Sequence, residues 1–151
     1  MDTVTYPEAK VIGLINANFV PLKVHIDESP ELAKRFEVHW TPSIIVTDPE
    51  GIEHHRITGF LPPEEYQAQL DFGIAKAAFN KEDYPKASKE FNLVVSEYPR
   101  SDIAPEAQYW LGVSEYKRTK SGDALMGAWK KLLEDYPDSP WAKRVSYIKE
   151  Q

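Results

Sequence analysis

The chain has 151 residues, a formal net charge of −6 and no cysteine. The absence of cysteine excludes disulfides, thiolate metal ligands and cysteine nucleophiles. The negative charge argues against a surface that binds nucleic acid, and no apolar run approaches the roughly 20 residues of a membrane-spanning helix. Hydrophobic residues make up 42% of the chain, which is enough for a packed core in one ordinary domain or two small ones.

The beginning of the chain mixes helical and strand patterns. Apolar residues at helical spacing predict a helix over 7–18, with Pro7 in its first turn, where a missing N–H costs little. Strict alternation of apolar and polar residues then predicts a strand over 20–26. Ser29 is the predicted cap of a short helix that ends near Phe36.

A hairpin and a change of pattern follow. The continuous apolar run at 44–46 predicts a strand that is covered on both faces. Residues 48–51, Asp-Pro-Glu-Gly, have turn chemistry, and 52–58 is the predicted return strand. Beyond Pro62-Pro63 the pattern becomes helical throughout. The helices predicted there span 63–79, 84–98, 104–118 and 123–136, and a short fifth helix begins near 139–140.

The helical part contains an internal repeat. Residues 91–99 read FNLVVSEYP and residues 129–137 read WKKLLEDYP, at an offset of 38 residues. Helix pairs at this spacing are typical of helical-repeat arrays, in which each pair covers the apolar face of its neighbour.

This part resembles the tetratricopeptide repeat family over about 64–148. Ala87, Phe91 and Pro99 have the family's spacing of small residue, aromatic residue and proline, and Leu111-Gly112 matches its Leu-Gly pair. The Tyr-Pro-x-Ser segments that follow both repeats look like the bacterial envelope and coordinator-type subgroup. The resemblance implies binding of proteins or peptides along a concave face.

The first part of the chain resembles the back portion of a thioredoxin fold. The segments that carry the resemblance, in the family's order and spacing, are 19–24, 32–38, 41–43, 48–51 and 57–60. The resemblance implies that Pro42 is the cis-proline of that fold, and that the backbone just before it pairs with an extended peptide.

The chain departs from the thioredoxin family at its beginning. The family's first strand, first helix, second strand and Cys-x-x-Cys motif have no counterpart, so we expect Met1 to fall inside a helix just beyond that motif. The missing strand would lie between 20–26 and 43–47. We therefore expect these two strands to pair directly, or a second copy to complete the sheet, because unpaired edges recruit other strands.

The predicted peptide-binding residues form two groups. The first is Trp40, Thr41 and Pro42, where a bound strand would gain main-chain hydrogen bonds and an apolar contact with Trp40. Its alternative is that Trp40 covers the gap left by the missing segment. The second group is Tyr109 and Trp110, from an aromatic-rich set on the repeat helices, and its alternative is core packing.

No catalytic site, metal site or cofactor is predicted. His54 and His55 are neighbours on a strand, so they point to opposite faces and do not share an ion. We expect one of them to face inward and the other to lie on the surface. No glycine-rich phosphate loop or nucleophile elbow is present.

The expected fold class is an incomplete thioredoxin-like α/β module joined to an all-α tetratricopeptide-like region. The predicted domains are 1–62 and 63–151, and they share the helix that begins at Pro63. The predicted function is non-catalytic binding of a protein or peptide in a bacterial protein, without nucleic acid binding or membrane insertion.

Two other functions stay open at this point. One is a fragment of a thiol–disulfide oxidoreductase whose redox cysteines precede Met1, and the other is a structural scaffold that forms a homodimer. Because no secretory signal is visible, we expect a cytoplasmic location, or a periplasmic one if Met1 is not the native start.

Overall fold

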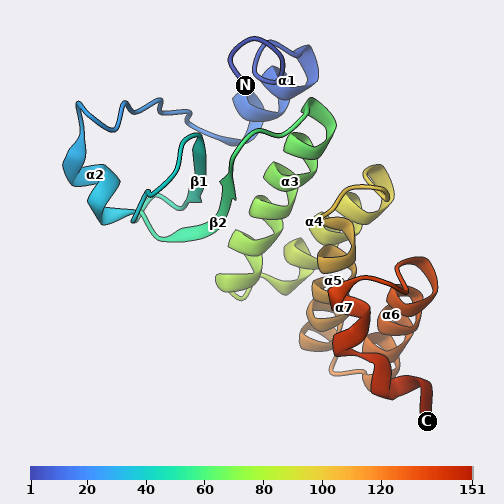
Figure 1. Ribbon diagram of the computed structural model, residues 1–151. Helices are drawn as coiled ribbons and strands as arrows, with labels where there is room; N and C mark the ends of the chain where they lie inside the picture. Colours follow the sequence, from blue (N-terminus) through green and yellow to red (C-terminus); the bar gives the residue numbers. More distant parts are fainter. Residues whose placement is uncertain (151) are drawn as a thin grey trace.

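The computed structural model describes residues 1–150 and confirms the predicted fold class, a thioredoxin-like α/β part joined to an all-α part (Figure 1). Its elements are α1 (Ala9–Asn18), α2 (Pro30–Arg35), β1 (Ser43–Thr47), β2 (Glu53–Thr58), α3 (Pro63–Asn80), α4 (Tyr84–Glu97), α5 (Ala104–Thr119), α6 (Gly122–Asp135), α7 (Pro140–Arg144) and the 3₁₀ helix η1 (Ser146–Glu150). Each predicted helix is present, with ends within two residues of the prediction. None of the described helices is long and apolar enough to span a membrane.

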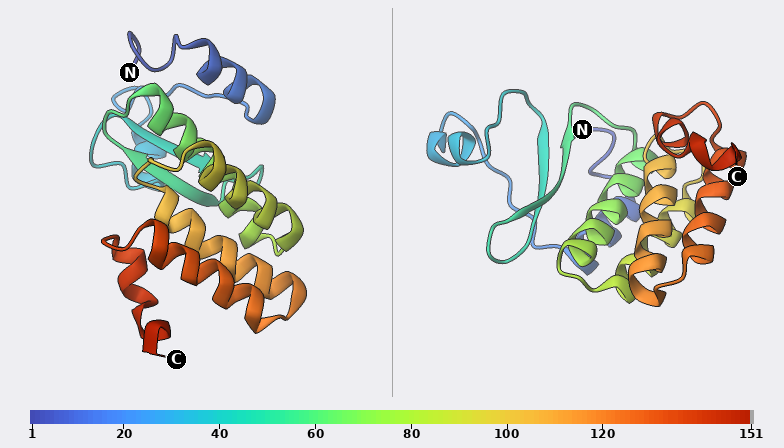
Figure 2. Two further views of the ribbon diagram at one scale, coloured as in Figure 1. Left: turned by 90° about the vertical axis from the view of Figure 1, so that its right-hand side faces the viewer. Right: turned by 90° about the horizontal axis from the view of Figure 1, so that it is seen from below.

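The elements form an extended series. The β1–β2 hairpin packs on one side of α3, and α4, α5 and α6 follow one another on the other side (Figure 2). The helix α2 lies beyond the hairpin, at the opposite end of the series from the C-terminus. The α/β part and the helical pairs therefore meet along α3.

The hairpin turn is held by one aspartate. The carboxylate of Asp48 accepts the N–H of Ile52 at 2.9 Å, and the N–H of Asp48 bonds to the Ile52 carbonyl at 3.1 Å. Gly51 in this turn has φ of +77°, which a side chain would disfavour. In the antiparallel register Ile44 lies opposite Ile57. A two-stranded hairpin is marginal by itself in water, so its stability depends on packing against α3.

The prediction of a strand over 20–26 is wrong, and so is the prediction that this strand pairs directly with 43–47. Residues 19–25 run without regular structure between α1 and α2, and the Val20 and Leu22 side chains are 96% and 79% exposed. Alternation of apolar residues indicates only which side of the chain would be apolar if the chain were extended. A strand also needs a partner for its main-chain hydrogen bonds, and no described residue of β1 or β2 provides one here.

Helix α3 is covered on two sides. Phe72 is 1% exposed, and its ring lies 5.0 Å from the His55 ring of β2 and 5.5 Å from the Phe91 ring of α4. Next to it, Gly73 allows close approach to the sheet, since a Cβ there would lie 3.0 Å from Cγ2 of Val46. The small and aromatic residues of α3 thus join the hairpin to the repeats.

Equivalent tyrosines close the two helix pairs. The Tyr98 hydroxyl, just after α4, donates to the Asp71 carboxylate of α3 at 3.0 Å. The Tyr136 hydroxyl, just after α6, donates to the carbonyl of Pro99 at 2.9 Å. The first bond lies within a helix pair and the second joins neighbouring pairs, so the repeated tyrosine serves packing at both positions.

Local capping explains why the helix starts could be predicted. Side chains of Asp83, Ser121 and Ser139 accept main-chain N–H groups at the starts of α4, α6 and α7. A cap of this kind stabilises a helix by about 1 kcal/mol. The predicted cap Ser29 precedes α2 without such a side-chain hydrogen bond.

Replacing Gly73 by leucine should destabilise the chain by about 1–3 kcal/mol, because the new side chain would push α3 away from Val46 and His55. The exposed helix glycine Gly13 is the matched control, because a Cβ at that position would meet no heavy atom within 4 Å. Gly13→Leu should leave the free energy of unfolding unchanged or raise it slightly, since leucine is the better helix former. Urea unfolding measures both, and equal effects would contradict the close approach.

Candidate functional site

The outer edge of β1 borders a hollow. Within residues 1–150 the sheet contains β1 and β2 alone, so the edge of β1 away from β2 has no strand beside it. The hollow measures about 650 Å³ and lies between this edge, the segment that follows α1, and α3. Apolar side chains dominate its lining, among them Phe19, Leu22, Ile44, Tyr66 and Leu70. An extended chain would find both main-chain partners and an apolar floor here.

Trp40, Thr41 and Pro42 lie directly before this edge. The Thr41–Pro42 peptide bond is cis, as the thioredoxin resemblance implied. Thr41 and Pro42 line the hollow, and the Pro42 carbonyl accepts the N–H of Gly59 at 2.8 Å. The Trp40 carbonyl accepts the Ser43 hydroxyl at 2.7 Å, while 68% of the Trp40 residue is exposed. The main chain is anchored here, and the indole is left free to contact a partner.

Other exposed apolar residues occur in the same part of the chain. Val20, Leu22 and Phe60 are each more than half exposed, in addition to Trp40. Clusters of exposed apolar side chains on a soluble domain often mark interaction sites. Val20 and Leu22 also line the hollow, whereas Trp40 and Phe60 do not.

Tyr109 and Trp110 belong to a different part of the molecule. Both lie on α5 and are half-buried. Tyr109 stacks on Trp129 of α6 with ring centroids 5.2 Å apart. Trp110 contacts Phe79 of α3, and the Lys76 ammonium lies 3.9 Å from the centre of its ring. The structure does not bring this pair together with the Trp40 group, and these contacts join neighbouring helices as core packing does.

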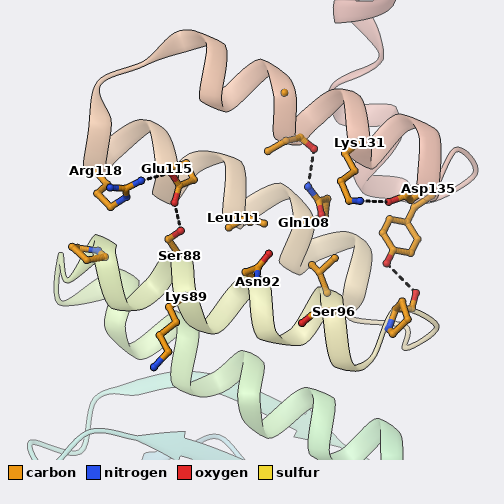
Figure 3. A pocket seen from close by; sticks show the side chains of 16 residues that line it. Ser88, Lys89, Asn92, Ser96, Gln108, Leu111, Glu115, Arg118, Lys131 and Asp135 are labelled. Carbon is orange, nitrogen blue, oxygen red and sulfur yellow. Dashed lines mark hydrogen bonds and ion pairs between the residues drawn. The ribbon is translucent and has the colours of Figure 1, made fainter.

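A groove that the sequence patterns did not reveal runs over α5, between α4 and α6 (Figure 3). Its volume is about 1060 Å³, and Leu111 and Gln108 of α5 lie between the walls. On the α6 side it is lined by the small residues Gly127 and Ala128. Small residues on a helix face were the available signal, but the groove exists only because three helices meet.

The hairpin histidines have structural partners. Nε2 of His54 lies 3.0 Å from the Asp48 carboxylate, and Nδ1 lies 2.9 Å from the Asn80 amide of α3. Nε2 of His55 lies 2.6 Å from the Gln69 side chain. The prediction that one of them lies on the surface is wrong: the His54 side chain is 4% exposed, and His55 packs on Phe72. The two rings have different partners, although both sets include residues of α3.

The hydrogen bonds and burial of the hairpin also shift the pKa values of two of its titratable groups. The Ile52 N–H, and after it the His54 ring, hold the pKa of Asp48 below its usual range. Burial lowers the pKa of His55. Among residues 1–150, no group of three or more histidine, aspartate or glutamate side chains is arranged to hold a metal ion.

Asp71 is a buried carboxylate on α3. Its residue is 6% exposed, and burial raises its pKa to about 6, against the opposing effect of the Tyr98 hydrogen bond. The charge of Glu90 raises it further. Asp71 lines neither the hollow nor the groove, so its shifted pKa reflects the α3–α4 contact rather than a reactive site.

Two family matches follow the expected order of a thioredoxin-like part and then a helical part. Residues 4–74 match the thioredoxin-like domain family, and residues 63–150 match the family described as outer membrane lipoprotein. The second match covers more than half of the chain, so the chain belongs to that family of helical-repeat proteins. The two matches overlap along the first turns of α3.

Two curated relatives share part of the sequence. Both are called cell division coordinator CpoB, one from Pseudomonas putida strain KT2440 and one from Pseudomonas putida without that strain designation. Each is 37% identical over 51 residues, which is 34% of this chain and 19% of the relative. The chain therefore spans about a fifth of the length of these relatives. No solved structure matches the chain.

The buried carboxylate of Asp71 should make stability depend on pH. Because its native pKa lies above that of an unfolded aspartate, the native state binds the proton more tightly, and stability falls as the pH rises from about 4 through 6. Asp71→Asn removes this ionisation and keeps an acceptor for Tyr98. The variant should be more stable than wild type at pH 7.5, by up to about 2 kcal/mol, and the difference should vanish near pH 4.

Urea unfolding of wild type and variant at both pH values measures this difference. Asp138→Asn, at an exposed carboxylate, is the control for the loss of one negative charge. A difference between wild type and Asp71→Asn that is the same at pH 4 and pH 7.5 would contradict the buried ionisation.

Proposed function

We propose that the chain is a non-catalytic protein-binding scaffold that accepts an extended segment of a partner protein along the free edge of β1. The observation that carries the proposal is the combination of an unpaired strand edge and an apolar hollow beside it. Strand addition uses main-chain hydrogen bonds for affinity and side-chain pockets for specificity. The β1 edge offers main-chain groups for such hydrogen bonds, and the hollow beside it offers space for side chains.

The position of Trp40 supports this role. Its backbone is held by Ser43 at the start of β1, while its indole extends into solvent. Exposed tryptophans beside a groove are typical binding hot spots, because a large rigid ring buries much apolar area at little entropic cost. We assign Thr41 and Pro42 to the same binding edge, and we give Tyr109 and Trp110 a supporting, packing role.

A non-catalytic role agrees with the chemistry of the chain. Thiol–disulfide exchange needs a thiolate, and this chain contains no cysteine. The shifted carboxylates Asp48 and Asp71 are held by structural partners. The two relatives are named cell division coordinator. A coordinator works through other proteins, so this name favours a protein partner for the present chain as well.

The family assignment bears on location. The family is described as outer membrane lipoprotein, and the relatives' name refers to cell division. We infer that the chain works in the periplasm, within the cell envelope, rather than in the cytoplasm. We further propose the division into 1–62 and 63–151 with α3 shared, which the overlap of the two family matches over 63–74 supports.

A second copy of the chain is the other occupant that the β1 edge favours. A homodimer in which two β1 strands pair would satisfy the same main-chain groups. Light scattering at several concentrations separates the two functions: a monomer leaves the edge free for a partner, and a concentration-independent dimer with protected β1 amides would make the chain a structural scaffold.

Trp40→Ala should weaken binding of extended peptides by at least about tenfold without loss of stability, because the side chain is largely exposed. Peptides are selected on the immobilised wild-type chain from a displayed library of random ten-residue sequences. Hydrogen exchange then locates the site where the selected peptides bind. We expect slower exchange of the main-chain amides of 43–47 when a peptide is bound.

The control is Tyr147→Ala, which removes another exposed aromatic side chain at the far end of the molecule. It should leave the affinity of the selected peptides unchanged. Peptides that bind Trp40→Ala as tightly as wild type, or that leave exchange at 43–47 unaltered, would refute docking at this edge.

A further inference from the structure

The free edge of β1 carries main-chain groups whose directions follow from the register of the hairpin. Ser43 lies opposite Thr58, so Pro42, one residue earlier, lies opposite Gly59. The Gly59 N–H bonds to the Pro42 carbonyl at 2.8 Å, which makes these two residues a hydrogen-bonded pair. Hydrogen-bonded and non-hydrogen-bonded pairs alternate along an antiparallel ladder, so this one bond fixes the direction of every later group of β1 up to the bulge after Val46.

Ser43 and Ile45 are the residues of β1 that face the open side. By the alternation, Ile44 and Val46 direct their N–H and C=O groups toward β2, and Ser43 and Ile45 direct theirs away from it. Among the residues that the structure describes, none forms a hydrogen bond with the main-chain groups of Ser43 or Ile45 on that side. Each of the two residues therefore offers one donor and one acceptor to a third strand.

The side chains of β1 show which face of such a third strand would be covered. Val46 faces α3, since its Cγ2 lies 3.0 Å from where a Cβ on Gly73 would be. Ile44 packs against the same cluster as Tyr66 and Leu70 of α3. Because side chains alternate along a strand, every second side chain of a third strand beside β1 would also face α3 and enter the hollow.

The lining of the hollow determines which side chains can enter it. The charged side chains of the lining are those of Asp2 and Lys23, and they pair with each other at 3.1 Å. Apolar surface is supplied by Phe19 and Leu22 after α1 and by Leu70 of α3. A charged side chain in the hollow would lose water without gaining an unpaired partner, whereas an apolar one would be buried favourably.

We propose that the β1 edge selects a segment of a partner protein in which every second side chain is apolar and uncharged. The main chain of the segment bonds to Ser43 and Ile45, and its apolar side chains fill the hollow of about 650 Å³. This inference rests on the proposed function and names the class of segment that the edge recognises. Its length matches the 5 residues of β1, and proline is excluded where the segment donates to the edge.

The first test uses the peptides selected on the wild-type chain and needs no variant of the protein. Each position of a selected peptide is replaced by aspartate in one series, and its main-chain nitrogen is methylated in a second series. Affinity should fall at least about tenfold at alternate positions of each series and stay within about twofold between them. Similar losses at successive positions, or no losses, would overturn the proposal.

The second test changes the edge itself. Ile45→Pro removes an N–H from the open side of β1 and none from the ladder with β2, so it should weaken the selected peptides at least about tenfold. Thr58→Pro is the matched control, because Thr58 is exposed and its N–H points away from β1 at the other edge of the sheet. It should leave affinity within about twofold. Equal losses for the two variants would overturn the pairing with Ile45.

Hydrogen exchange separates failure of this inference from failure of the proposed function. A bound peptide should slow exchange at the Ser43 and Ile45 amides above all, since the Ile44 and Val46 amides already bond to β2. Peptides that slow exchange over 43–47 but show no alternation in either series would support the proposed function and overturn this inference. Peptides that bind without slowing exchange there would overturn both.

Discussion

Packing on two sides of α3 is the constraint on which the rest of the structure depends. The hairpin has two strands among the described residues and needs a helix to bury its apolar face, while α4 needs the other side of the same helix. Phe72 meets both neighbours, and Gly73 lets the sheet approach. A helix with a single apolar stripe could not serve both contacts.

This arrangement explains how two different kinds of surface occur on a small chain. The hollow beside β1 uses Tyr66 and Leu70 of α3 as its floor, whereas the groove on the repeats is formed by α4, α5 and α6. One surface is an open strand edge beside an apolar hollow, and the other is a groove whose acidic residues are paired with Arg118 and Lys131. The two surfaces therefore differ in the chemical groups that they expose.

The features that the sequence predicted well are those decided by neighbouring residues. Helix starts follow from caps such as Asp83 and Ser139, and the hairpin turn follows from Asp48 and Gly51. The segment 20–26 could not be predicted, because its alternation is local whereas strand formation depends on a distant partner. The groove was missed for the same reason: Lys89, Gln108 and Ala128 come from three helices, and only folding brings them together.

The sequence of the segment after α1 has a consequence for solubility. Its apolar residues Val20, Leu22 and Val24 line the hollow beside an unpaired strand edge, a combination that ordinarily invites chains to stack into fibrils. Pro21 lacks a main-chain N–H, and Lys23 adds a charge that is paired with Asp2 at 3.1 Å. A proline and a charged lysine are residues that ordinarily oppose such stacking, so we expect this segment to resist it.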